Sequence, residues 1–179
     1  MNHLKSLVDD KTRAVMVNNP SNPCGSVWSK THMLEILEVV QQLHLPLISD
    51  EVYFDMVFHQ KAFHSFGEVS EDVPVIVVGG LAKRFLVPGW RLGWVIIHDR
   101  HSLLSEIRQG IYKLAQLTLG ANSLVQSILP EVLLRTPKEF FENSNKLLQE
   151  HADYLVDRIE AIDGMHIIPP GGAMYIMVK

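Results

Sequence analysis

Three short, mainly apolar runs in the first half of the chain constrain its fold more than any other feature. The runs 13–18, 45–49 and 75–78 do not alternate between polar and apolar residues, which is typical of strands covered on both faces. After the first run, Ser29 is a candidate helix N-cap. The apolar residues that follow it at helical spacing are Met33, Ile36, Leu37, Val40 and Leu43. This order of strand, helix and strand favours parallel pairing with a right-handed crossover, so the sequence predicts an α/β fold with a mostly parallel sheet.

The middle of the chain predicts a fourth strand and two helices that flank the sheet. Residues 52–71 form a long surface connection, and residues 92–97 are a further apolar run. A helix over about 102–117 would end before Gly120, and a second helix over about 122–134 would be kinked at Pro130. The first of these helices would carry Leu103, Leu104, Ile107, Ile111 and Leu114 on one face.

Thr136, Pro137 and Glu139 form the pattern of a strong helix start. Thr136 is expected to be the N-cap, Pro137 the first helical residue and Glu139 the partner of Thr136 in a capping box. The helix would run to about Ile162 and stop at Gly164. It is long and more polar than the helices before it, so we interpret it as a connector. Its expected inner face consists of Phe141, Leu148, Leu155 and Ile159.

Two short strands are predicted after this helix, over 165–168 and 173–178, with a turn between them at 169–172. We therefore expect a larger domain in residues 1–135, and the connector helix with the start of a small α+β domain in residues 136–179. The last run has no polar residue that would terminate it as a strand. We accordingly expect that the chain is an incomplete domain.

The stretch 79–94 contains the candidate catalytic group, Lys83. Gly79 and Gly80 would let the backbone turn tightly where the third strand ends. Lys83 would then lie at the carboxyl end of a strand, where open α/β sheets bind ligands. An amine held there beside a second cation, Arg91, is suited to form an imine with a carbonyl compound. For this stretch alone, a solvated Lys–Arg pair without a chemical role is the alternative.

Polar side chains that follow three of the predicted strands would suit one ligand. Asn22 lies beyond the first strand, Asp50 at the end of the second, and Lys83 with Arg91 beyond the third. Together with the phenol of Tyr53, these groups match a zwitterionic aromatic aldehyde phosphate, which describes pyridoxal 5′-phosphate. Each residue also has a purely structural reading: Asp50 as a strand-end cap, Tyr53 as a core aromatic and Asn22 as a turn residue.

Four motifs occur in order along the chain. They are residues 18–26 (Asn-Asn-Pro-Ser-Asn-Pro-Cys-Gly-Ser), 49–53 (Ser-Asp-Glu-Val-Tyr), 79–94, and 171–175 (Gly-Gly-Ala-Met-Tyr). Through them the chain resembles the fold-type-I pyridoxal-phosphate aminotransferases, and most closely their tyrosine aminotransferase branch. The resemblance covers essentially the whole chain, and four ordered motifs are far more specific than one. It implies an aspartate-aminotransferase-like fold in which residues 1–135 are the later part of the cofactor-binding large domain.

The resemblance also implies a role for each candidate residue. Lys83 would be the Schiff-base lysine that also moves a proton, and Asp50 would pair with the pyridine nitrogen. Tyr53 and Asn22 would donate to the ring oxygen of the cofactor, and Arg91 would bind its phosphate. The same resemblance implies a cis peptide before the proline that follows Asn22, and a homodimer in the full-length parent.

The activity implied by the resemblance is transamination of an aromatic amino acid, tyrosine with 2-oxoglutarate as acceptor, to its 2-keto acid. Two alternatives stay open: a pyridoxal-phosphate-dependent C–S lyase or other β-eliminating enzyme, and a catalytically inactive truncated subunit. Gly80 stands where many members of the family carry a phosphate-binding serine. The family's glycine-rich phosphate-binding turn and its substrate-carboxylate arginine would lie outside residues 1–179. We therefore expect that this chain alone does not complete transamination at a normal rate.

Composition argues against several other classes of function. The net charge is −4 and no long basic run occurs, which argues against nucleic acid or a membrane surface as the main partner. The single cysteine, Cys24, fits a reducing compartment, and the nine scattered histidines form no metal-binding pattern. The first residues lack the apolar segment of a signal peptide. We expect a cytoplasmic protein, and a mitochondrial location stays open if an upstream segment carries a transit peptide.

Overall fold

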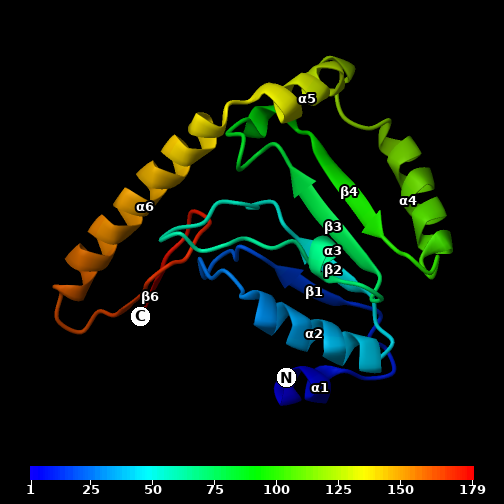
Figure 1. Cartoon of the computed structure of the whole chain (residues 1–179), viewed down its shortest axis with the longest axis horizontal. Coiled ribbons are helices and arrows are strands. Elements are labelled where there is room, and N and C mark those ends of the chain that lie inside the picture. Colours follow the sequence, from blue (N-terminus) through cyan, green and yellow to red (C-terminus); the bar gives the residue numbers. More distant parts are fainter.

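A four-stranded sheet forms the centre of the structure, a computed structural model that describes residues 1–179 (Figure 1). Its strands lie in the order β1 (Val15–Asn18), β2 (Leu47–Asp50), β3 (Val75–Gly80) and β4 (Gly93–His98). The first three strands are parallel, and β4 pairs with β3 in the antiparallel sense. The predicted α/β fold with a mostly parallel sheet is therefore confirmed, including its four strands.

Helix α2 (Lys30–Gln42) covers one face of the sheet, together with the one-turn helix α3 (Phe66–Val69). The hydroxyl of Ser29 accepts a hydrogen bond from the His32 amide, so the predicted N-cap is confirmed. The predicted apolar face packs on β-branched strand residues. The buried core consists of Val17, Met33, Ile36, Leu37, Val40, Leu47, Phe66, Val69, Val73, Val75 and Val77.

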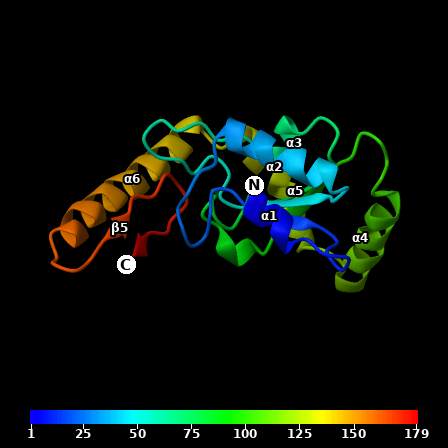
Figure 2. The same ribbon diagram turned by 90° about the horizontal axis from the view of Figure 1, so that it is seen from below.

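Three helices follow the sheet: α4 (Ser105–Thr118), α5 (Ser123–Arg135) and α6 (Lys138–Glu160). Figures 1 and 2 show α4 and α6 at opposite ends of the molecule, with α5 between them along the chain. The short helix α1 (Asn2–Leu7) at the N-terminus was not predicted. No helix combines the length and the apolar character needed to cross a membrane.

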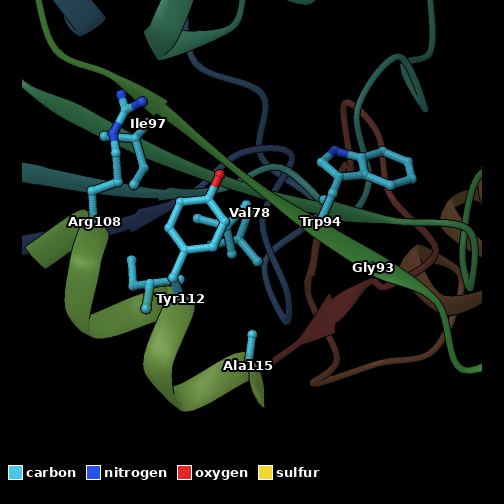
Figure 3. A pocket seen from close by; sticks show the side chains of 10 residues that line it. Val78, Gly93, Trp94, Ile97, Arg108, Tyr112 and Ala115 are labelled. Atoms are coloured by element: carbon cyan, nitrogen blue, oxygen red, sulfur yellow. The ribbon is translucent and has the colours of Figure 1, made fainter. Parts of the chain in front are cut away.

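The apolar face predicted for α4 is largely exposed in the structure. Among its five residues only Leu104, the N-cap, is buried, whereas Ile107 and Leu114 are 50% and 63% exposed. A cavity of about 550 Å³ lies between α4 and the β3–β4 pair, with Tyr112 on the helix and Trp94 on the strand among its lining residues (Figure 3). The helical spacing identifies an apolar face correctly, but spacing does not determine what covers that face.

The start of α6 also differs from the prediction. Pro137 is the N-cap and makes no capping hydrogen bond through its side chain. The Thr136 hydroxyl instead donates to the carbonyl oxygen of Val132, at 2.6 Å, so it ends α5 and does not start α6. The capping box is therefore wrong, because two helices meet here and the hydroxyl serves the earlier one. The long helix itself is confirmed, although Ala152 is its only buried residue.

The two predicted C-terminal strands are confirmed as a short antiparallel pair, β5 (Ile167–Ile168) and β6 (Met177–Val178). The turn between them is bonded to the loop after β1, because the amides of Gly171 and Gly172 both donate to the carbonyl oxygen of Gly25, at 2.7 and 3.0 Å. The division into domains at residue 135, and the kink in α5, stay predictions.

Gly79 and Gly80 do not form a turn, contrary to the prediction. Both lie in β3, opposite Trp94 and Gly93 of β4. A Cβ atom on Gly79 would lie 2.5 Å from the indole nitrogen of Trp94. Glycine is therefore needed for the close approach of a side chain from the neighbouring strand, and the chain turns only after the strand has ended.

Candidate active site

The ends of β1, β2 and β3 lie next to one another, and the loops that follow them meet there. Asn18 at the end of β1 is in register with Asp50 at the end of β2, which in turn pairs with Val78 in β3. The side chain of Asn18 joins two of these segments. Its amide nitrogen donates to the carbonyl oxygen of Asp50 at 3.0 Å, and its oxygen accepts from the backbone of Asn22 at 2.6 Å. This network holds Asn22 beside Asp50.

The loop after β1 is fixed by its prolines and by a buried asparagine. The peptide before Pro23 is cis, which confirms that prediction, and the peptide between Asn19 and Pro20 is also cis. The fully buried side chain of Asn19 accepts a hydrogen bond from the amide of Trp28, at 3.0 Å. Asn19 was not singled out from the sequence, because its role depends on the distant backbone that it contacts.

Tyr53 is buried close to this loop, and its hydroxyl contacts a residue from the far end of the chain. The hydroxyls of Tyr53 and Tyr175 are 2.6 Å apart, with their rings in an edge-to-face arrangement. Burial first, and then the bond to Tyr175, raise the pKa of Tyr53 above its ordinary value, while the side chain of Asn22 opposes the shift. A phenol is protonated at neutral pH even at its ordinary pKa, and the raised pKa of Tyr53 extends this to more alkaline pH, so its hydroxyl can act as a hydrogen-bond donor.

Lys83 lies on the turn that follows β3. Its carbonyl oxygen accepts from the amide of Leu86 at 3.0 Å, and the side chains of Leu81 and Phe85 on either side of it are buried. Lys83 is partly exposed, and its ammonium nitrogen lies 5.7 Å from the centre of the Tyr53 ring. The structure thus brings Lys83 and Tyr53 together although thirty positions separate them.

Two of the predicted site residues also make local contacts. Asp50 accepts a hydrogen bond from the amide of Val52 at 3.1 Å, so it caps the end of its strand as the structural reading expected. Arg91 has a left-handed backbone with φ of 51° and is exposed. Its guanidinium donates to the carbonyl oxygen of Pro88, at 3.0 Å, and to none of the other four residues. The contacts therefore link Asn22, Asp50, Tyr53 and Lys83, and the place of Arg91 in the site stays a prediction.

Glu51 is a buried carboxylate that the sequence did not single out as a functional group. One of its oxygens accepts from the hydroxyl of Ser49 and from the amide of Phe66 at the start of α3, both at 2.9 Å. Burial is the largest influence and raises the pKa of Glu51, while its hydrogen bonds partly counteract this effect. Glu51 therefore anchors the connection between β2 and α3 beside Asp50.

Replacement of Glu51 by glutamine is expected to change how stability depends on pH. Above the ordinary pKa near 4.5, and up to the raised pKa of the folded chain, folded protein holds more protons than unfolded protein. The free energy of unfolding of the wild type therefore falls as pH rises through this window. Urea unfolding at a series of pH values should show Glu51→Gln gaining stability relative to wild type across it. A difference that stays constant with pH would contradict the prediction.

The gathered side chains fit pyridoxal 5′-phosphate by chemical type: an amine for its aldehyde, a carboxylate for its pyridine nitrogen, and a phenol and an amide for its ring oxygen. Two cavities, of about 550 and 580 Å³, lie along β3 and β4, and none of the five predicted residues lines either of them. We therefore identify the candidate site by the chemical type of its side chains and not by a cavity. No group of three or more His, Cys, Asp or Glu side chains is placed to hold a metal ion.

The chain matches known proteins along essentially its whole length. Residues 1–179 match the family model described as aminotransferase class I and II. The tyrosine aminotransferase of Homo sapiens is 48% identical over 179 residues, which cover 99% of this chain and 39% of that protein. The tyrosine aminotransferase of Dictyostelium discoideum is 46% identical over 184 residues, which cover 100% and 44%. The chain therefore spans less than half the length of these relatives.

A solved structure with the same fold supports this result. An alanine aminotransferase from Pyrococcus furiosus superposes with a TM-score of 0.94 at 35% sequence identity. The match covers 99% of this chain and 45% of that one. The predicted fold is confirmed by this overlap.

Proposed function

Because the chain belongs to the class I and II aminotransferase family, we propose that it supplies the cofactor lysine for transamination of an aromatic amino acid. One observation carries the proposal: the ammonium of Lys83 lies 5.7 Å from the ring of Tyr53, and the side chains of Asn22 and Asp50 are neighbours of Tyr53. Relatives at 46–48% identity are tyrosine aminotransferases, which supports tyrosine as the amino donor. The proposed acceptor is 2-oxoglutarate, and the proposed products are the 2-keto acid of tyrosine and glutamate.

Each residue of the candidate site would have a separate role in holding the cofactor or moving a proton. Pyridoxal 5′-phosphate, when bound, supplies an electron sink for the charge left by the α-proton. Lys83 would hold the aldehyde carbon and then move that proton as a general base and acid. Asp50 would keep the pyridine nitrogen protonated, and Tyr53 with Asn22 would donate to the ring oxygen. Arg91 would bind the phosphate through guanidinium donors that its single bond to a backbone carbonyl leaves free.

Borohydride reduction after incubation with pyridoxal 5′-phosphate tests this assignment. We expect digestion and mass mapping to place one pyridoxyl group on the peptide that contains Lys83. Lys113, on an exposed position of α4, is an internal control that should stay unmodified at low cofactor concentration. A chain with no adduct on Lys83, or with adducts spread evenly over its lysines, would contradict the assignment.

Product analysis separates the proposed activity from the lyase alternative. Transamination of L-tyrosine conserves amino groups, so glutamate and the keto acid of tyrosine should form in equal amounts. A C–S lyase would release pyruvate, ammonia and a thiol from a cysteine conjugate. Parallel reactions with L-alanine test whether the chain shares the amino donor named for the Pyrococcus furiosus protein.

Three further expectations belong to this proposal. We infer a cytoplasmic location, supported by the single exposed cysteine, Cys24, which has no partner for a disulfide. We propose a homodimer, as the family implies, which size measurement in solution will test. We also propose that residues 1–135 belong to the cofactor-binding domain and residues 136–179 to a smaller one.

A further inference from the structure

Arg84, the residue after the proposed cofactor lysine, is held between two aromatic rings. Its guanidinium carbon lies 4.3 Å from the ring centre of Phe54 and 4.3 Å from that of Phe141 in α6. A terminal nitrogen of the same group lies 2.9 Å from the carboxylate of Asp55, and the side chain is only 17% exposed. Phe54 and Asp55 directly follow Tyr53 in the sequence. Arg84 therefore contacts the Tyr53 turn and α6 at the same time.

The surroundings of Arg84 favour a planar cation. Burial lowers the pKa of its guanidinium, and the charge of Asp55 counteracts that effect. Its Nε–H group is buried and has no hydrogen-bond partner, which costs stability. Stacking on two rings and the ion pair must offset this cost. A flat guanidinium can fill a slot between two ring faces, whereas the compact ammonium of a lysine cannot.

The same two rings also hold the residue after Arg84. Phe85 packs on Phe54 and on Phe141, with ring centres 6.4 and 5.2 Å apart. Consecutive side chains of the turn are thus fixed against one aromatic cluster, while Lys83 extends toward Tyr53. The backbone of the turn cannot shift without disturbing this cluster.

Helix α6 also bonds directly to the backbone that follows β2. The side chain of Asn145 donates to the carbonyl oxygen of Asp55 at 2.7 Å. One turn further along α6, the side chain of Gln149 accepts from the amide of His59, also at 2.7 Å. Phe141, Asn145 and Gln149 lie four residues apart, so they form one stripe of the helix that faces the turn after β2.

We propose that Arg84 is a positioning residue: by joining the lysine turn to Phe54, Asp55 and Phe141, it sets where the amine of Lys83 lies relative to Tyr53. This inference rests on the proposed function of Lys83. Arg84 touches neither cofactor nor substrate in this role. Its effect is therefore confined to steps that require the Lys83 amine to reach a particular point.

Two cofactor forms distinguish this role from a general structural one. Pyridoxal 5′-phosphate forms a covalent bond with Lys83, whereas pyridoxamine 5′-phosphate presents the same ring and phosphate without an aldehyde. In Arg84→Met, the Kd for the aldehyde form is expected to rise about tenfold or more, because a small displacement of a reacting group has large effects. The Kd for the amine form should change by less than about twofold, because it uses only the non-covalent contacts. Arg84→Lys keeps the charge but not the planar group, so it should resemble Arg84→Met.

Arg135 provides the matched control, since it is an exposed arginine paired with Glu131. Arg135→Met should bind both cofactor forms as the wild type does. Equal weakening of both forms in Arg84→Met, unchanged binding of the aldehyde form, or full recovery in Arg84→Lys would each overturn the positioning role. Absence of a Lys83 adduct in the wild type would instead overturn the proposed function, and this inference with it.

Discussion

Replacement of Lys83 by alanine is expected to abolish the pyridoxyl adduct and to slow exchange of the α-proton of L-tyrosine by about 10²- to 10⁴-fold. The amine is the nucleophile for the aldehyde and the group that moves the proton, so both properties depend on one atom. The ammonium of Lys83 is the one that lies over the ring of Tyr53, at 5.7 Å from its centre. Borohydride mapping measures the adduct, and NMR in deuterated water measures the exchange.

Lys113→Ala is the control for this experiment, because Lys113 is exposed on α4 and makes no salt bridge. It should leave both the adduct and the exchange rate unchanged. Proton exchange that persists at the wild-type rate in Lys83→Ala would show that another group acts as the base. An adduct that moves to a different lysine would show that the cofactor pocket does not depend on Lys83.

Replacement of Gly172 by alanine is expected to destabilise the fold by about 3 kcal/mol, the upper part of the range for overpacking a tight site. A Cβ atom there would overlap the carbonyl oxygen of Met56 and lie 2.8 Å from a methyl group of Val27. The backbone cannot move aside easily, because Ala173 donates to the same carbonyl oxygen at 2.8 Å and Gly172 donates to Gly25. Urea unfolding measures the change in the free energy of unfolding.

Gly110 is the control for the Gly172 substitution. It lies within α4, and a Cβ atom built on it meets nothing within 4 Å. Gly110→Ala should therefore stabilise the chain by about 0.5–1 kcal/mol, since alanine loses less backbone freedom in a helix. If Gly172→Ala unfolds at the same urea concentration as the wild type, the close packing of the turn onto Met56 does not persist in solution.

The central sheet was predictable from the sequence, whereas several details around it were not. Short β-branched runs and the helical spacing after Ser29 are local signals, and α2 with the parallel strands obeys them. Thr136 follows the rule for a helix start, but it lies where one helix ends and the next begins, so its hydroxyl bonds backward to Val132. Gly79 and Gly80 predict a turn from the local sequence, but Gly79 serves the close approach of Trp94, which depends on strand pairing.

The candidate site was predictable to the extent that its groups follow strand ends. The alignment of β1, β2 and β3 brings Asn22, Asp50 and Tyr53 together, as an ordered parallel sheet requires. The roles of Glu51 and Arg84 were missed because each depends on residues far away in sequence. A carboxylate beside Asp50 and a cation beside Lys83 have no local pattern that marks them as buried.

The contact between Gly25 and the turn at Gly171 and Gly172 has a consequence for the order of folding. The loop after β1 is bound by a segment close to the end of the chain, and Tyr53 reaches the same segment through Tyr175. Closing this longer loop costs more entropy than closing the loop between β1 and β2, so we expect these bonds to form later than the β1–β2 pairing. During synthesis, the loop that carries Asn22 therefore acquires this support only after residues 171 and 172 have left the ribosome.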